Sequence, residues 1–163
     1  MPSATSFSGN SLATVIVLSV LIPAPMDAVW AAISDLASHT RWMADAESIE
    51  FEAGPTQGVG TRLRVATRIG PLRTVDMLEV VEWVERRRIS VVHSGVVSGR
   101  GSFDIVPLAG GTRLRWRERL VFPWWLGGPV TAWVAGPILA RVWRGNLARL
   151  CQEIKGGGYS PTA

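Results

Sequence analysis

The stretch that decides the fold runs from Arg113 to Leu120 and reads RLRWRERL. Arginine alternates in it with other residues, and successive side chains of a β-strand point to opposite faces of the sheet. We therefore predict a strand with a solvent-facing arginine side formed by Arg113, Arg115, Arg117 and Arg119. The inward side carries Leu114, Trp116, Glu118 and Leu120. Glu118 is then a carboxylate on an otherwise apolar face.

A tryptophan-rich helix is expected after this strand. Residues 128–155 carry apolar side chains at helical intervals, over a length that exceeds a strand. Pro137 should kink or interrupt the early part of this helix, because proline cannot donate a backbone hydrogen bond. We expect the helix to cover the apolar face of the sheet and close a cavity lined by large rings, with Trp125 and Trp133 among them.

The composition fits one domain with an aromatic interior. The chain has 163 residues, with eight Trp, four Phe and one Tyr. A domain of this length buries roughly 70% of the surface that its unfolded chain exposes. Large rings line ligand cavities, and they also fill ordinary cores. Composition alone leaves both interpretations open.

Arginine supplies nearly all of the positive charge, since Lys155 is the only lysine. The net charge of +4 and the pI near 10.5 allow nonspecific contact with anionic membranes or nucleic acid, but they do not define a role. The densest basic run, over 86–88, lies beside Glu82 and Glu85. We interpret the arginines as a solvated face and expect no specific nucleic-acid partner. Transient contact with an anionic membrane or an acidic protein is the alternative.

Few residues point to a disulfide, a metal or a cofactor. Cys151 is the only cysteine, which excludes an intramolecular disulfide and is compatible with a reducing cytosol. The chain has two histidines, His39 and His93, so a zinc site lacks ligands. No phosphate-binding glycine loop, dinucleotide-binding pattern or Ser-His-Asp spacing is present. We expect no metal and no cofactor.

The apolar run over 15–22 indicates a strand rather than an export signal or a membrane span. No basic segment precedes it, prolines follow it, and it is too short to cross a bilayer. The part of the long helix over 130–142 contains a proline and an arginine. This argues against a membrane-spanning helix but not against attachment to a membrane surface. We expect a cytoplasmic protein, with peripheral membrane contact left open.

The order of predicted elements is that of an α+β protein. A flexible tail over 1–13 precedes a strand over 14–22 and two short helices, one after Pro25 and one over 39–43. Turns then separate about six strands, over 46–53, 60–69, 72–84, 87–95, 98–107 and 111–121; we interpret the glycines at 95, 99 and 101 as turn and bulge positions. The helix over 128–155 and a flexible tail over 156–163 end the chain. We predict one domain over 14–155, a curved antiparallel sheet of about seven strands around the long helix. Its inner face is expected to carry Val15, Val17, Leu63, Val65, Phe103, Ile105, Leu114 and Trp116.

Four segments resemble the START-like superfamily, also called polyketide cyclase/dehydrase or SRPBCC. They are PAPMDAVWAAISDLASHTRWM over 23–43, GVGTRLRV over 58–65, MLEVVEWVERRRISV over 77–91 and GRGSFDIVPLAGGTRLRWRERL over 99–120. The resemblance covers about residues 14–155 and rests on the order and spacing of the segments. It implies a helix-grip fold with an internal cavity. The superfamily includes lipid and sterol carriers, hormone and quinone binders, polyketide aromatases or cyclases, and chaperone cofactors, so the fold leaves function open.

Glu118 is the best single candidate for chemistry, because an inward carboxylate beside Trp116 is desolvated and can act as an acid or base. A buried ion pair or a hydrogen bond to the backbone is the structural alternative. His93 alternates with Ile89 and Val91 and is therefore expected on an apolar face. There it is either a satisfied core residue or a second proton-transfer group.

Arg141 is the candidate partner of this carboxylate or of an anionic ligand. It follows Pro137 by about one helical turn, and its planar guanidinium suits a carboxylate or a phenolate. The phase of the helix after Pro137 leaves both an inward and an outward side chain open.

Three functional hypotheses follow. The first is binding and carriage of a small hydrophobic molecule such as a lipid, polyketide or quinone. Its expected ligand-binding residues are Phe103, Trp116, Glu118, Trp125, Trp133, Arg141 and His93. The second is a polyketide cyclase/dehydrase type of enzyme in which Glu118 and His93 move protons, and the third is an interaction module that uses the arginine face. A polar cluster inside the cavity favours the enzyme, a dry apolar cavity the carrier, and a continuous basic face the interaction module.

Overall fold

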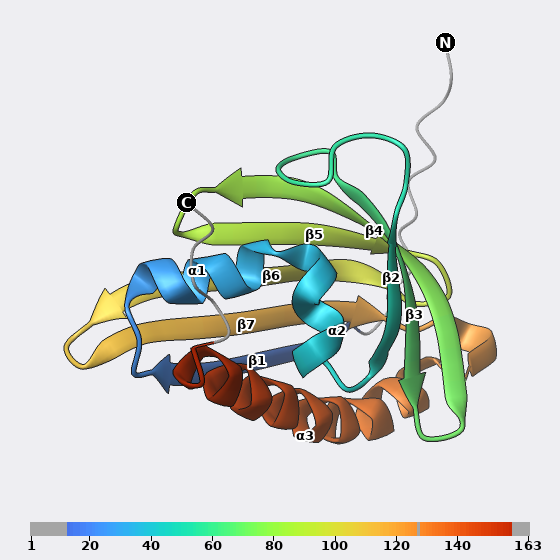
Figure 1. Ribbon diagram of the computed structural model, residues 1–163. Coiled ribbons are helices and arrows are strands. Elements are labelled where there is room, and N and C mark those ends of the chain that lie inside the picture. Colours follow the sequence, from blue (N-terminus) through green and yellow to red (C-terminus); the bar gives the residue numbers. More distant parts are fainter. Residues whose placement is uncertain (1–12, 127, 158–163) are drawn as a thin grey trace, which may run out of the picture.

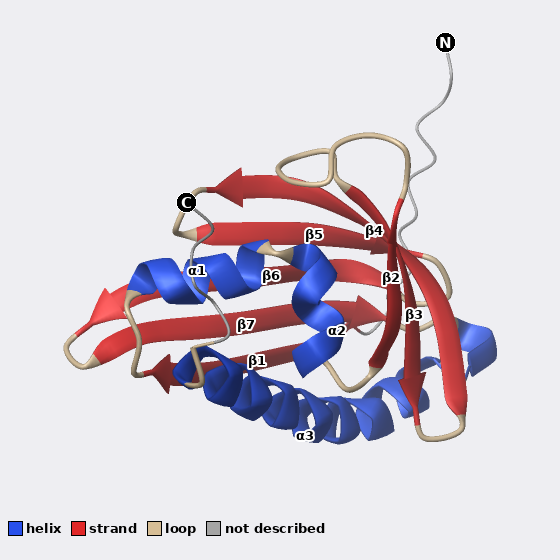
Figure 2. Cartoon of the chain, viewed as in Figure 1, coloured by secondary structure: helices blue, strands red, loops and turns tan. Residues whose placement is uncertain are grey.

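A curved sheet of seven strands surrounds one long helix in the computed structural model, which describes residues 13–126 and 128–157 (Figures 1 and 2). The strands are β1 (Ala13–Ile22), β2 (Ala46–Phe51), β3 (Arg62–Ile69), β4 (Leu72–Val84), β5 (Arg88–Ser94), β6 (Ser98–Leu108) and β7 (Gly111–Val121). The helices are α1 (Met26–Ser34), α2 (His39–Trp42) and α3 (Gly128–Lys155), with 3-10 turns η1 (Leu36–Ser38) and η2 (Trp124–Leu126). The predicted α+β helix-grip fold is confirmed. The predicted tails lie largely outside the described residues.

The sheet is antiparallel throughout, in the order β1-β7-β6-β5-β4-β3-β2. Each strand from β2 to β6 pairs with the next one along the chain, and β1 pairs with the other edge of β7. A register shift between Val80 and Glu82 interrupts the β4–β5 ladder, and such irregularities bend a sheet. All three α-helices lie on the same side of the sheet (Figure 1). α3 continues through Pro137 as one helix, so of the two predicted effects of this proline, a kink or an interruption, the interruption is absent.

Strand β7 has the predicted two faces. Leu114, Trp116, Glu118 and Leu120 are buried, and the four alternating arginines are exposed. The inner face packs against α3 through a contiguous apolar core, to which the helix contributes Leu139, Trp143, Leu147, Leu150 and Ile154. This arrangement places Glu118 inside the molecule.

The predicted phase of β1 is wrong. Val15 and Val17 are 58% and 42% exposed, whereas Ile16 and Leu18 are buried. Ile16 pairs with Glu118 in the β1–β7 register, and residues that face each other across a ladder share one face of the sheet. Because β1 is apolar at almost every position, its sequence contains no alternation from which the inner face can be identified.

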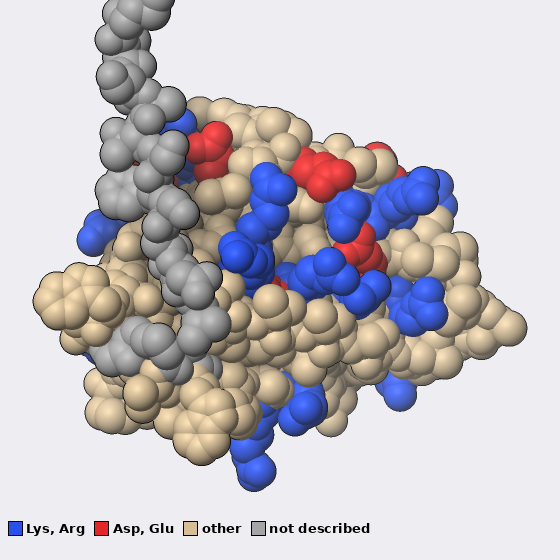
Figure 3. Space-filling view, turned by 180° about the vertical axis from the view of Figure 1, so that it is seen from behind, with Lys and Arg blue, Asp and Glu red and all other residues tan. Residues whose placement is uncertain are grey.

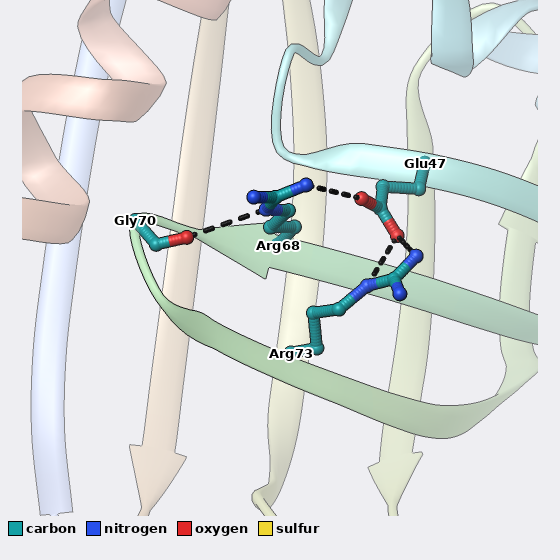
Figure 4. Close-up of polar contacts among 4 residues, drawn as sticks. All are labelled: Glu47, Arg68, Gly70 and Arg73. Carbon is teal, nitrogen blue, oxygen red and sulfur yellow. Dashed lines mark hydrogen bonds and ion pairs between the residues drawn. The ribbon is translucent and has the colours of Figure 1, made fainter.

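A charged cluster on Glu47 ties the edge strand β2 to β3 and β4 (Figure 4). Nε of Arg73 donates to Oε2 of Glu47 at 2.9 Å, and Nη1 of Arg68 lies 3.7 Å from Oε1. Nε of Arg68 also donates to the carbonyl oxygen of Gly70 at 3.3 Å, in the β3–β4 turn. The cluster joins the hairpin to the edge strand at one end of the sheet.

A buried polar network fixes α3 against the segment after α2. Nε1 of Trp143 and Nδ2 of Asn146 donate to the two carboxylate oxygens of Asp45, at 3.1 and 2.6 Å. Nε of Arg149 donates to the carbonyl oxygen of Trp42 at 3.0 Å. Buried polar groups are normally paired in this way, because an unpaired one is destabilising. The network sets the position of the Trp143 ring inside the molecule.

Candidate functional site

The candidate site is a cavity of about 210 Å³ between the sheet and the helices. Apolar side chains form most of its wall, among them Ile49, Leu63, Val65, Leu78, Val91 and Leu139. A wall of this kind with a few polar groups is typical of a small-molecule site. An apolar cavity of about 150 Å³ can hold benzene. The interior therefore has room for a ligand larger than one aromatic ring.

His93 and Glu118 form a pair inside this cavity. Strand β5 carries His93 and strand β7 carries Glu118, and Nε2 of the imidazole lies 3.2 Å from Oε2 of the carboxylate. The two atoms are at ion-pair distance but not aligned for a hydrogen bond. Both side chains line the cavity and both are largely buried. The pair lies on a mostly apolar wall, which also carries Asp76 and His39.

Trp116 holds the other carboxylate oxygen of Glu118. The indole Nε1 donates to Oε1 at 2.9 Å. The indole itself stacks on Trp143, with ring centroids 4.9 Å apart and an interplanar angle of 24°. Phe103 packs against the same ring at 5.1 Å. These aromatic contacts keep Trp116, and through it Glu118, in one orientation.

Gly101 makes room for the carboxylate. It faces Glu118 across the β6–β7 ladder and Val91 across the β5–β6 ladder. A Cβ atom on Gly101 would lie 2.6 Å from the carboxylate carbon of Glu118, closer than packed atoms come. A glycine inside a strand often marks such a close approach. The interpretation of Gly101 as a turn or bulge residue is wrong, because it pairs in regular register with both neighbouring strands inside β6.

Asp76 on β4 is a second carboxylate near His93. It accepts hydrogen bonds from Oγ1 of Thr74 at 3.1 Å and from the backbone N–H of Val97 at 3.3 Å. Burial alone would lower the pKa of His93, but the Glu118 carboxylate and the charge of Asp76 outweigh it, so this pKa is raised above its ordinary value. The raised pKa favours an imidazolium that can donate a proton.

His39 lines the cavity from the opposite, helical side and behaves differently. Its Nε2 donates to the carbonyl oxygen of Ile33 at 3.0 Å, and its ring packs edge-on against Phe103. Burial lowers the pKa of His39 to about 4, against weaker opposing effects of this hydrogen bond and of Asp35. The ring is therefore neutral at physiological pH, with its proton on Nε2.

The structure brings four of the predicted site residues together. Phe103, Trp116, Glu118 and His93 all line the cavity. The other three predicted ligand-binding residues point to solvent. Trp125 and Trp133 are 59% and 81% exposed, and Arg141 is exposed on α3. None of these three lines the cavity. The inner face of α3 carries Leu139 and Trp143 instead, so the helical phase turns Arg141 away from Glu118.

Asp76 is a cavity residue that the sequence interpretation missed. It alternates along β4 with Leu72, Thr74 and Leu78, all of which line the cavity. The same period-2 argument that identified Glu118 therefore applies to Asp76.

Within residues 13–126 and 128–157, no group of three or more His, Cys, Asp or Glu side chains is arranged to hold a metal ion.

Fold and cavity together define a helix-grip protein of the START-like superfamily. The chain belongs to the family described as polyketide cyclase/dehydrase and lipid transport, whose model matches residues 13–155. No curated protein matches the chain in sequence.

Solved structures with this fold include enzymes and proteins named only by superfamily. The Zhui aromatase/cyclase from Streptomyces sp. R1128 has a TM-score of 0.76 at 16% identity, over 93% of this chain and 99% of that chain. A START superfamily protein from Mycobacterium smegmatis has a TM-score of 0.73 at 16% identity, over 87% of this chain and 97% of that chain. The di-domain aromatase/cyclase StfQ of the steffimycin biosynthetic pathway has a TM-score of 0.71 at 14% identity, over 91% of this chain and 52% of that chain. At these identities the likeness concerns the fold.

No helix among the described residues is both long enough and apolar enough to cross a bilayer.

Proposed function

We propose that the protein binds a small, mainly apolar molecule in the cavity and that His93 and Glu118 recognise one polar group of that molecule. The observation that carries the proposal is the position of this pair on a mostly apolar wall. Apolar surface supplies the binding free energy in such sites, and a few polar groups orient the ligand. Carriage of a lipid, polyketide or quinone is the activity that fits a cavity of this kind.

The polar group expected on the ligand is a hydroxyl or carbonyl oxygen. Nδ1 of His93 has no hydrogen-bond partner among the described residues and is available as a donor or acceptor. An anionic ligand group is disfavoured, because Glu118 and Asp76 already place two carboxylates beside the imidazole. An uncharged oxygen in the cavity avoids that repulsion.

A proton-transfer enzyme of the cyclase/dehydrase type is the second candidate function. The polar cluster of His93, Glu118 and Asp76 inside the cavity is the observation that favours it. In a dehydration, a base removes a proton from the carbon next to a carbonyl, and an acid protonates the departing hydroxyl, which leaves as water. A paired histidine and carboxylate of this kind can supply the acid and the base.

A ligand panel tests the binding proposal. Fatty acids, quinones and aromatic polyketides are added separately, and the melting temperature and intrinsic tryptophan fluorescence are recorded. A ligand that binds the folded state raises the melting temperature, and a ligand beside Trp116 and Trp143 changes the fluorescence. The expected result is that both signals change for at least one class. If no class changes either signal, the binding proposal is wrong.

A further inference from the structure

Three tryptophans lie exposed at the end of the molecule where α3 begins. Trp124 is 85% exposed and Trp133 81% exposed, and Trp125 is more than half exposed. Together with the exposed side chains of Val130, Val134 and Ile138 they form what we call the tryptophan patch. We propose that the tryptophan patch docks on the surface of an anionic phospholipid bilayer.

Four members of the tryptophan patch lie on one face of α3. Val130, Trp133, Val134 and Ile138 recur at intervals of three and four residues, which places them on one side of α3. The opposite side carries Leu139 and Trp143 into the cavity. Trp124 and Trp125 come from η2, just before this helix. A large exposed apolar surface marks an interaction site, and tryptophan is the residue that favours the boundary between lipid and water.

The charge beside the tryptophan patch selects an anionic partner. From Arg119 to Gln152 the sequence contains four arginines and no Asp or Glu. Arg141 and Arg144 continue the exposed side of α3 beyond Ile138, and neither forms an ion pair with a described carboxylate. A helix with an apolar exposed face and basic neighbours binds to anionic lipid surfaces.

The arginines also argue against a second copy of this chain as the occupant. A parallel contact between two tryptophan patches would bring Arg141 and Arg144 of both copies close together, and like charges across a contact are unfavourable. The exposed arginines of β7 lie on the outer face of the sheet, seen in Figure 3, where acidic side chains are interspersed. They add to the net charge of +4 without forming part of the tryptophan patch.

The tryptophan patch lies between two cavity-lining residues along the chain. Phe122 and Leu139 both line the cavity, and they flank the tryptophan patch along the chain. Leu72, at the β3–β4 turn, lines the same cavity and is half exposed, so the cavity wall reaches the surface there. If the proposed ligand binding holds, docking brings the cavity close to the bilayer as a source of an apolar ligand. Docking itself does not depend on ligand binding.

Vesicle flotation of the full chain tests the docking. Vesicles of pure phosphatidylcholine are compared with vesicles that contain about 30% phosphatidylserine, at about 0.1 M salt. The protein should float with the anionic vesicles, and the double variant Trp124→Ser/Trp133→Ser should bind them at least about tenfold more weakly. The matched control is Val84→Ser/Val106→Ser, which removes two exposed apolar side chains elsewhere and should leave binding unchanged.

Two further measurements make the outcome decisive. Arg141→Gln/Arg144→Gln should weaken binding to the anionic vesicles and reduce its dependence on salt. Sedimentation of the wild type and of the double tryptophan variant reports self-association. Absence of anionic-vesicle binding, or binding that the tryptophan changes leave intact, overturns the proposal. A dimer that the same changes dissociate overturns it as well, because the tryptophan patch is then a contact between copies.

Discussion

Gly101 lies directly opposite Glu118 in the β6–β7 ladder, and a Cβ atom at Gly101 would overlap the carboxylate. The absence of a side chain on β6 therefore determines where the acid group on β7 can lie. This relationship connects a single glycine to the geometry of the His93–Glu118 pair.

Gly101→Ala should displace the Glu118 carboxylate and lower the free energy of unfolding by about 1 to 3 kcal/mol, as overpacking of a buried site does. Denaturant titration measures this loss, and ligand affinity should fall with it. Gly145→Ala in α3 is the control, since a Cβ there meets only the Arg149 side chain at 3.7 Å, and alanine favours a helix. Equal stability and affinity of Gly101→Ala and wild type would show that the carboxylate does not depend on this space.

Glu118→Gln separates a structural or ligand-orienting role from proton transfer. We expect the free energy of unfolding to drop by about 1 to 3 kcal/mol and the ligand affinity to drop too, because His93 loses its charged partner. Glu79→Gln is the control, as Glu79 is a half-exposed carboxylate that pairs with Arg62 on the surface. A Glu118→Gln variant with normal stability and affinity but turnover reduced by about a hundredfold or more would favour the enzyme instead.

Stability should depend on pH in opposite ways at the two histidines. The folded-state pKa of His93 is raised, so its contribution is complete below the unfolded pKa of about 6.5 and is lost as the pH rises through the folded-state value. The pKa of His39 is lowered to about 4, so the unfolded chain takes up its proton first and stability falls as the pH drops from about 6.5 towards 4.

Denaturant titrations across pH check this pattern in the wild type, His39→Gln and His93→Gln. His39→Gln should reduce only the loss of stability as the pH falls, and His93→Gln only the loss of stability as the pH rises. If His39→Gln loses as much stability in acid as the wild type, other groups cause that loss.

The fold could be predicted because the alternation of four arginines with buried side chains identifies the two faces of β7. The inner face of β1 could not, since that strand is apolar on both sides. The contact between His93 and Glu118 depends on how β5, β6 and β7 pair with one another, and the sequence of one strand does not predict these registers. The outward positions of Trp133 and Arg141 depend on the phase of α3, which the sequence left open, and Trp125 lies before this helix, in η2.

Native mass spectrometry of the protein purified from its own host tests ligand binding most directly. We expect one small apolar molecule per chain, which appears as a mass above that of the polypeptide and is released on denaturation. Val65→Phe, which places a larger side chain in the cavity wall, should carry much less of it while remaining folded. Wild-type protein that shows the polypeptide mass alone, and that gains no melting temperature from any class of the ligand panel, would contradict the proposed binding.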